Sequence, residues 1–238
     1  MQVIIKQPSE TLKRGLPFAG NPPIAAIVDV SAESRGLVAG SQPLLVAGEL
    51  VAGMLFVQLL GGTDGERYLV TAKAEAGAEI LESEIEVAVL DSEWATPEGG
   101  AGYLTIREFV DRFGLEEVVR MTDSDGTGRI DRALLVNALG AVQAKADVYI
   151  SARYTVPLDP VPEIVKVAIG DMARARLYPR GAPEGVSDDA KAAEKLLEKI
   201  SDGRLPLPSA AALPQAASST PILVSPGRRQ YPNGLQDY

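Results

Sequence analysis

The segment from Asp123 to Asp131 contains the residues whose types and spacing are best suited to chemistry. Oxygen-bearing side chains stand at positions one, three, five and nine of a calcium loop of the helix-loop-helix type: Asp123, Asp125, Thr127 and Asp131. Position twelve, which should supply a bidentate glutamate, is Leu134, so calcium or magnesium would bind weakly. The alternative is an ordinary turn in which Asp131 or a neighbour caps the following helix. The sequence leaves both interpretations open.

Two residue types are absent from the chain, and their absence restricts its chemistry. Without cysteine, disulfides, thiolate catalysis, Cys-ligated zinc and iron-sulfur clusters are excluded. Without histidine, the chain lacks the commonest general base near neutral pH and the commonest metal ligand. Carboxylate, lysine or tyrosine chemistry would need a recognisable motif. We therefore expect a protein that is not an enzyme and that has no cofactor.

Two other segments resemble parts of enzyme sites and have simpler interpretations. Glu116 and Glu117 would suit a carboxylate hydrolase, but adjacent residues of a helix point apart. The segment 61–66, Gly-Gly-Thr-Asp-Gly-Glu, lacks the Gly-Lys-Ser/Thr end that a phosphate loop needs. It predicts a hairpin turn between two apolar runs.

Size and composition predict two folded domains. The chain has 238 residues, 46% of them hydrophobic, and no apolar run approaches the roughly 18 to 20 residues that cross a bilayer. Its first residues lack the layout of a secretory signal, so we expect a soluble protein. Most of the net charge of −9 lies in residues 1–100, which carry 6 Lys and Arg against 14 Asp and Glu. This acidic half disfavours contact with DNA.

The first half of the chain has the pattern of β-strands. Short apolar runs separated by glycine and proline occur at residues 24–30, 44–47, 50–60, 67–73 and 82–89. Alternation in the last two runs gives apolar faces with Tyr68, Val70, Ala72, Ile85, Val87 and Val89. Glu82, Glu84 and Glu86 should then point outward. The pattern predicts a small antiparallel β-sandwich.

The second half has the spacing and caps of helices. Thr105 and Glu108 have capping-box spacing, and Gly114 ends the short helix that they begin. A second short helix is expected at 115–121, and the longest at 130–154, where apolar positions recur three or four residues apart.

Two more helices are expected further along. Pro160 and Pro162 introduce a helix through Tyr178 that is apolar on more than one face and should be the most buried. Residues 187–189 are expected to cap a last helix that ends at Gly203.

Beyond Gly203 the chain is rich in proline and small residues and has no period, which predicts an extended arm. Apolar and basic residues of this arm are candidates for docking onto a partner: Ile222, Leu223, Val224, Arg228, Arg229, Tyr231 and Tyr238. The alternative is a tail without a binding role. The expected organisation is a β-sandwich domain at 1–95, a glycine-rich linker at 96–102, a helical domain at 103–203 and an arm at 204–238.

The turn at 61–66, followed by Tyr68-Leu-Val-Thr71 and by a last strand that ends at Val89, resembles an immunoglobulin-like β-sandwich of tailed-phage neck and tail proteins. The resemblance covers roughly residues 2–91. It implies the same sandwich that the alternation predicts.

The helical half is similar to the head-tail adaptor, or neck connector, family of Mu-like phages. The resemblance rests on an ordered series of motifs over about residues 103–208: Leu104-Thr-x-x-Glu108, Asp123-x-Asp125, Tyr149-x-x-x-Arg153-Tyr154, Pro157-Leu158, Val161-Pro162 and Asp171-x-Ala173-Arg174-x-Arg176-Leu177-Tyr178. It implies an all-α bundle that forms a ring, expected to be twelve-fold, beneath the portal protein and extends its arm onto it. Family members usually lack the fused β-domain.

The resemblance implies a function in the virion neck, with assembly in the host cytoplasm. Expected partners are the portal protein, further copies of the chain and a tail, stopper or terminator protein, while DNA passes through the channel without specific binding. Candidates for the subunit interface are Tyr149, Arg153, Tyr154, Arg174 and Arg176, with Asp147 and Asp171 as intersubunit or intrachain ion partners. The alternative function is a module that binds fibres or decoration proteins of the neck or tail through its β-domain.

Overall fold

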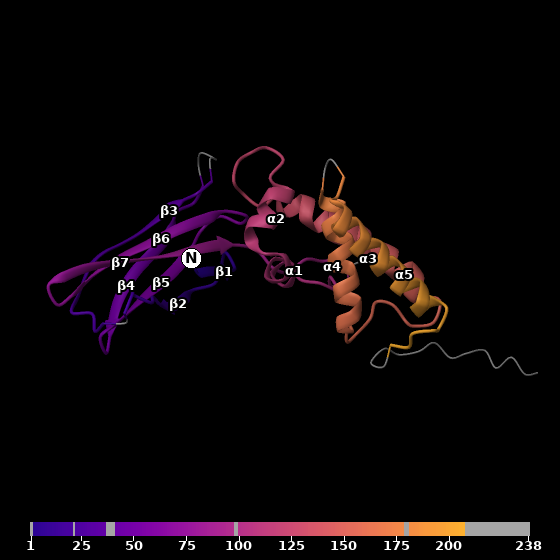
Figure 1. Ribbon diagram of the computed structural model, residues 1–238, viewed down its shortest axis with the longest axis horizontal. Helices are drawn as coiled ribbons and strands as arrows, with labels where there is room; N and C mark the ends of the chain where they lie inside the picture. The colour runs from indigo at the N-terminus through magenta and orange to yellow at the C-terminus, as the bar shows by residue number, and fades with distance from the viewer. Residues whose placement is uncertain (1, 21, 37–40, 98–99, 179–180, 208–238) are drawn as a thin grey trace, which may run out of the picture.

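The protein is described from a computed structural model that places residues 2–20, 22–36, 41–97, 100–178 and 181–207. Its strands all precede its helices in the sequence, and Figure 1 shows the strands at one end of an elongated molecule and α3, α4 and α5 at the other. The expected order of a β-rich half and a helical half is confirmed. Within the described residues, no helix is long and apolar enough to cross a membrane.

Seven strands of the described chain form two sheets. They are β1 (Gln2–Lys6), β2 (Leu12–Gly15), β3 (Ala26–Ser34), β4 (Leu44–Val51), β5 (Met54–Gly61), β6 (Arg67–Ala76) and β7 (Glu79–Val89). One sheet has the order β1-β7-β6-β3 and the other has the order β2-β5-β4. The expected antiparallel pairing of the last two runs is confirmed in β6 and β7, whereas β1, which the sequence pattern did not mark as a strand, runs parallel to β7.

The two sheets share one apolar core. The alternating residues from Tyr68 to Val89 are buried as predicted, and they meet Leu55, Val57 and Leu59 of β5. The expected outward position of Glu86 is wrong, since this side chain is only 2% exposed. The period of a strand tells which residues share a face, but not that another part of the chain covers the outer face.

The apolar run 50–60 is not a single strand. It is interrupted by a two-residue turn at Ala52 and Gly53, which have φ angles of 50° and 77°. Positive φ at both positions is typical of the turns that match the twist of a hairpin. β4 and β5 therefore form a hairpin. Because the residues on both sides of the turn are apolar, the hydropathy pattern does not reveal it.

Five helices follow: α1 (Ile106–Phe113), α2 (Leu115–Thr122), α3 (Arg132–Ile150), α4 (Glu163–Leu177) and α5 (Glu184–Ser201). The Thr105 hydroxyl accepts from the Glu108 amide, and the Glu108 carboxylate accepts from the Thr105 amide, which confirms the capping box. The cap expected at 187–189 is wrong. α5 begins three residues earlier, after Pro183, whose fixed φ favours a helix start.

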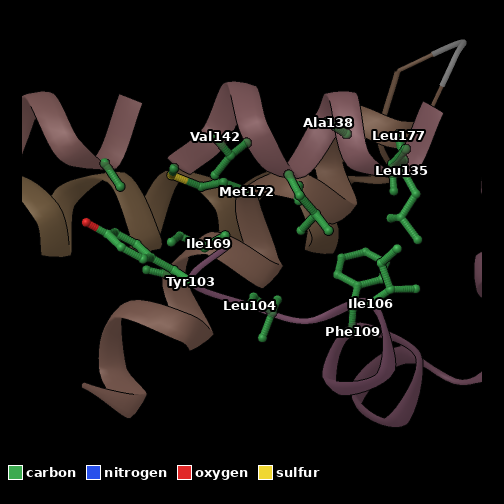
Figure 2. Close-up of a cluster of buried hydrophobic side chains, with 14 of the residues drawn as sticks. Tyr103, Leu104, Ile106, Phe109, Leu135, Ala138, Val142, Ile169, Met172 and Leu177 are labelled. Carbon is green, nitrogen blue, oxygen red and sulfur yellow. The ribbon is translucent and has the colours of Figure 1, made fainter. Parts of the chain in front are cut away.

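The helices pack around a second apolar core. Figure 2 shows side chains of α1, α3, α4 and the segment before α1 pointing toward one another, among them Phe109, Leu135 and Ile169. α4 packs against both α3 and α5, as its apolar faces predict. Leu90 and Trp94 also belong to this core, so the chain joins it before the helices begin.

The described residues at the two ends of the predicted linker pair with each other. Ala95 and Ala101 form an isolated β-bridge, and the Thr96 amide donates to the Gly100 carbonyl at 2.7 Å. Trp94 donates its indole N–H to the Leu104 carbonyl at 2.8 Å. The division of the chain into domains at this segment stays a prediction.

Candidate functional site

The two segments with the most motif-like sequences lie against each other. The Ile130 amide, at the end of the calcium-like loop, donates to the Gly65 carbonyl at 2.9 Å, while the Gly65 amide donates to the Val89 carbonyl at 2.8 Å. Gly65 has a φ of +82°, and a Cβ atom there would lie 2.5 Å from the Ile130 oxygen. Only glycine allows this backbone approach. The turn after β5 thus joins the β-rich half to the helical half.

Two buried carboxylates lie beside this contact between the two halves. Glu66 has no exposed surface, and its carboxylate accepts from the Ser41 hydroxyl at 2.8 Å and lies 3.5 Å from Arg129. Glu86 lies 3.2 Å from the Arg67 guanidinium and 3.6 Å from that of Arg35. A carboxylate buried away from water is costly without a cation beside it. The arginines compensate the negative charges of Glu66 and Glu86.

Arg67 also contacts the helical half. Its Nε donates to the Gly128 carbonyl at 3.1 Å, and its Nη1 donates to the Glu116 carboxylate at 3.0 Å. Arg67 is therefore bound to β7, to the calcium-like loop and to α2 at once. We call Gly65, Glu66, Arg67, Glu86 and Arg129 the joint.

Arg132, at the start of α3, adds further contacts between the two halves. Arg132 lies 3.0 Å from the Asp91 carboxylate and 3.6 Å from that of Asp64. The spacing of the sequence offered no signal for these pairs, because their members lie 41 and 68 positions apart. Glu116, one of the two adjacent glutamates of α2, is an ion partner of Arg67.

The calcium-like loop is closed by its own hydrogen bonds. The Asp123 carboxylate accepts from the Thr127 amide at 2.7 Å, the Thr127 hydroxyl at 3.0 Å and the Gly128 amide at 2.8 Å. Asp131 caps α3 by accepting from the Leu134 amide at 3.0 Å. The hydrogen bonds expected for a turn followed by a helix cap are therefore present. Over the described ranges, no group of three or more carboxylates is placed to hold a metal ion.

These hydrogen bonds make the stability dependent on pH. Burial tends to raise the pKa of Asp123, but the bonds from Gly128 and Thr127 outweigh it and lower the pKa below its ordinary value. The folded form therefore gains stability above a pH of about 4 and loses it as the pH falls through the lowered pKa.

Replacing Asp123 with asparagine is expected to cost about 1 kcal/mol at pH 7, because the charged acceptor is lost. The difference from the parent protein should shrink below a pH of about 4, where Asp123 itself becomes protonated. Urea unfolding at several pH values measures it. Asp125→Asn is the matched control, since Asp125 is exposed. A difference that does not change with pH would contradict the assigned role of the carboxylate.

Four of the five interface candidates are engaged within the chain. Tyr149 donates to Glu194 at 3.2 Å, Arg153 donates to the Ser201 carbonyl at 2.9 Å, and Tyr154 accepts from the Leu207 amide at 2.8 Å. Arg174 donates to Glu117 at 2.8 Å. Of the five candidates, only Arg176 is exposed.

Asp147 and Asp171, the expected ion partners of these candidates, are bonded to other residues of the chain. Asp147 accepts from the Tyr103 hydroxyl at 2.6 Å, and Asp171 accepts from Arg112 at 2.9 Å. Burial, helped by the bond to Asp147, raises the pKa of Tyr103 above its ordinary value. Tyr103 also accepts from the Leu158 amide at 2.8 Å, which connects α3 to the loop before α4.

Arg174 and Arg176 are expected to respond differently to replacement by alanine. The Arg174 guanidinium pairs with Glu117 at 2.7 Å and lies 5.0 Å from the centre of the Phe113 ring, so its loss should cost about 1 to 2 kcal/mol. Arg176→Ala should change the free energy of unfolding by less than about 0.5 kcal/mol. Urea unfolding followed by helical circular dichroism measures both. Equal effects of the two variants would show that the Arg174 contacts add no stability.

A groove runs along one face of α3, beside Trp94 and the loop that follows α3. It has a volume of about 1030 Å³ and is mainly apolar. Its lining includes Trp94, Val136, Gly140, Ala144, Val156 and Pro157. The arm residues from Ile222 to Tyr238 that the sequence singles out lie outside the described residues.

The helical half matches a known protein family. The family model described as bacteriophage Mu, Gp36 matches residues 103–225, slightly more than half of the chain. The match begins at the residue where the sequence pattern turns helical. No curated protein matches the chain.

Proposed function

Since the chain belongs to the bacteriophage Mu Gp36 family, we propose that it is a virion structural protein that acts as a head-tail adaptor. In this proposal, copies of the helical half form a ring under the portal protein and continue the DNA channel toward a tail, stopper or terminator protein. The location is the neck of the virion, and assembly takes place in the host cytoplasm. No catalytic step is assigned to the chain.

The observation that carries the proposal is the family match across the whole helical half. The geometry of the joint supports it. Two buried carboxylates and their arginines attach the β-rich half to α2 and to the loop before α3, so the two halves are held at a defined orientation. A structural subunit needs such a connection, because its copies must present the same shape to their neighbours.

The same contacts narrow the choice of subunit interface. Tyr149, Arg153, Tyr154 and Arg174 stabilise the subunit itself, whereas Arg176 keeps an exposed position next to a hollow lined by Arg120 and Leu134. We assign one side of the ring contact to Arg176 and Leu134. The near-neutral charge of the helical half suits a channel that must not retain DNA.

Phage particles produced without this chain provide the test. The expected result is DNA-filled heads that lack tails, with infectivity restored when the intact chain is supplied during assembly. A chain carrying Arg176→Glu should restore fewer particles, whereas Lys191→Glu, an exposed change on α5, should restore them fully. Normal tailed particles in the absence of the chain would refute the adaptor function.

Exposed apolar side chains at the end of the β-rich half that lies away from the helices favour a second function. Val51, Met54 and Ile80 are 41%, 55% and 64% exposed beside the β4–β5 and β6–β7 turns. Figure 1 places these turns away from the helices. In this alternative, the half is an immunoglobulin-like sandwich that holds a fibre or decoration protein. Met54→Glu combined with Ile80→Glu would then remove the fibre or decoration protein and leave head-tail joining intact.

A further inference from the structure

The face of α3 that lines the groove is more apolar than an exposed helix face normally is. Ala141 and Ala144 are exposed and Val136 is half-buried, and the neighbouring wall is formed by Trp94, Val156 and Pro157. A helix that is apolar on all sides is normally covered on all sides. Among the described residues, α4 and α5 cover one side of α3, and Trp94 packs beside Gly140 at the edge of the groove. The groove therefore has the character of a surface that receives an apolar segment.

The described chain stops close to this groove. Leu207, the last described residue, is buried, and its amide donates to the Tyr154 hydroxyl at 2.8 Å. Tyr154 is two residues from Val156 of the groove wall. The described chain thus ends beside the helical core.

The family match extends past Leu207 to residue 225. This end comes directly after Ile222, Leu223 and Val224, three large apolar residues in a stretch otherwise composed mainly of proline, alanine and serine. The family model treats this stretch as part of the same unit as the helices. Three adjacent large apolar residues gain most by leaving water for an apolar surface.

We propose that the groove on α3 holds Ile222, Leu223 and Val224 of the same chain. Residues 208–221 connect Leu207 to them and span about 20 Å as a flexible chain or about 45 Å when extended. A tether of this length gives the segment a high effective concentration at a nearby groove of its own chain. This inference goes beyond the proposed function, because it assigns the arm a binding site in the free protein.

Cysteine pairs test the proposal directly, since the natural chain has no cysteine. Ala144→Cys with Leu223→Cys places one thiol in the groove and the other on the segment. Ala192→Cys with Leu223→Cys is the matched control, because Ala192 is exposed on α5 and does not line the groove. Dilute purified protein is oxidised, and the disulfide products are identified by mass spectrometry.

The expected result is an intramolecular disulfide at least about tenfold more abundant for the groove pair than for the control pair. Similar yields for the two pairs would overturn the proposal, as would the absence of the disulfide from both. A groove-pair disulfide that forms only between two molecules would overturn the same-chain assignment.

Hydrogen exchange of the full chain gives a second readout that needs no cysteine. Amides of residues 222–224 should exchange about tenfold more slowly than in an isolated peptide of residues 208–238. Ala144→Arg should restore the fast exchange by filling the groove, and Ala192→Arg should not. Unprotected amides in the parent protein would refute the docking. Both experiments use purified protein, so their failure is separate from a failure of head-tail joining in particles.

Discussion

Replacing Arg67 with alanine is expected to lower the free energy of unfolding by about 3 to 5 kcal/mol. Arg67 is the nearer of the two cations beside Glu86, which is 2% exposed. Without it, the buried carboxylate keeps only Arg35 at 3.6 Å. The variant also loses the bonds to Gly128 and Glu116, so the contact between the two halves weakens with it.

Urea unfolding followed by two signals measures this effect. Trp94 is the single tryptophan and belongs to the helical core, so its fluorescence reports that half, whereas circular dichroism reports both halves. Lys73→Ala on the same strand is the matched control. Lys73 pairs with Glu82 at 3.8 Å with both side chains about half exposed, so its loss should cost less than about 0.5 kcal/mol. A similar small effect of Arg67→Ala would mean that the burial of Glu86 does not depend on Arg67.

Replacing Gly65 with alanine is expected to destabilise the protein by about 2 to 4 kcal/mol and to uncouple the unfolding of its halves. A Cβ atom at this position would lie 2.5 Å from the Ile130 carbonyl oxygen, so the backbone must move and the hydrogen bond between them must break. The positive φ adds a strain of roughly 1 kcal/mol. The fluorescence and circular dichroism transitions, which we expect to coincide in the parent protein, should separate.

Gly77→Ala isolates the effect of the close approach. Gly77 has a φ of +65° in the β6–β7 turn, but a Cβ atom there meets nothing within 4 Å. This variant should show only the backbone strain, about 1 kcal/mol, and keep the two transitions together. If Gly65→Ala and Gly77→Ala behave alike, the contact between Gly65 and Ile130 does not hold the halves together.

The joint also determines how the function of the β-rich half must be tested. A deletion of residues 1–98 would remove Leu90 and Trp94 from the helical core and would leave Arg132 without Asp91 and Asp64. Loss of head-tail joining in such a variant would report unfolding. Point changes at Met54 and Ile80 avoid this problem because both side chains are exposed.

Truncation of the arm is subject to the same reasoning. A chain that ends at Gly203 would lack Leu207, which is buried in the helical core and bonded to Tyr154. Ending the chain after Leu207 keeps that contact and removes only residues outside the described structure. This variant separates the role of the arm from the stability of the helices.

The sequence by itself determined the features that depend on neighbours in the chain. The alternation from Tyr68 to Val89 indicated which strand faces are buried, and Thr105 with Glu108 indicated where α1 begins. Asp131 was among the candidates for the cap of α3, because a helix start needs an acceptor within a few residues. The ordered motifs from Leu104 to Tyr178 indicated the phage family, which the match to residues 103–225 confirms.

Only the tertiary structure decided which distant residues meet. Glu86 follows the pattern of an outward residue, yet it is 2% exposed and lies beside Arg67 and Arg35. The calcium-like loop and the turn at 61–66 read as separate motifs, and their contact between Ile130 and Gly65 joins the two halves. Local periodicity records the face on which a residue lies, whereas the charge beside it depends on how separate segments of the chain pack together. For that reason the joint, rather than either motif, is what the structure adds to the sequence.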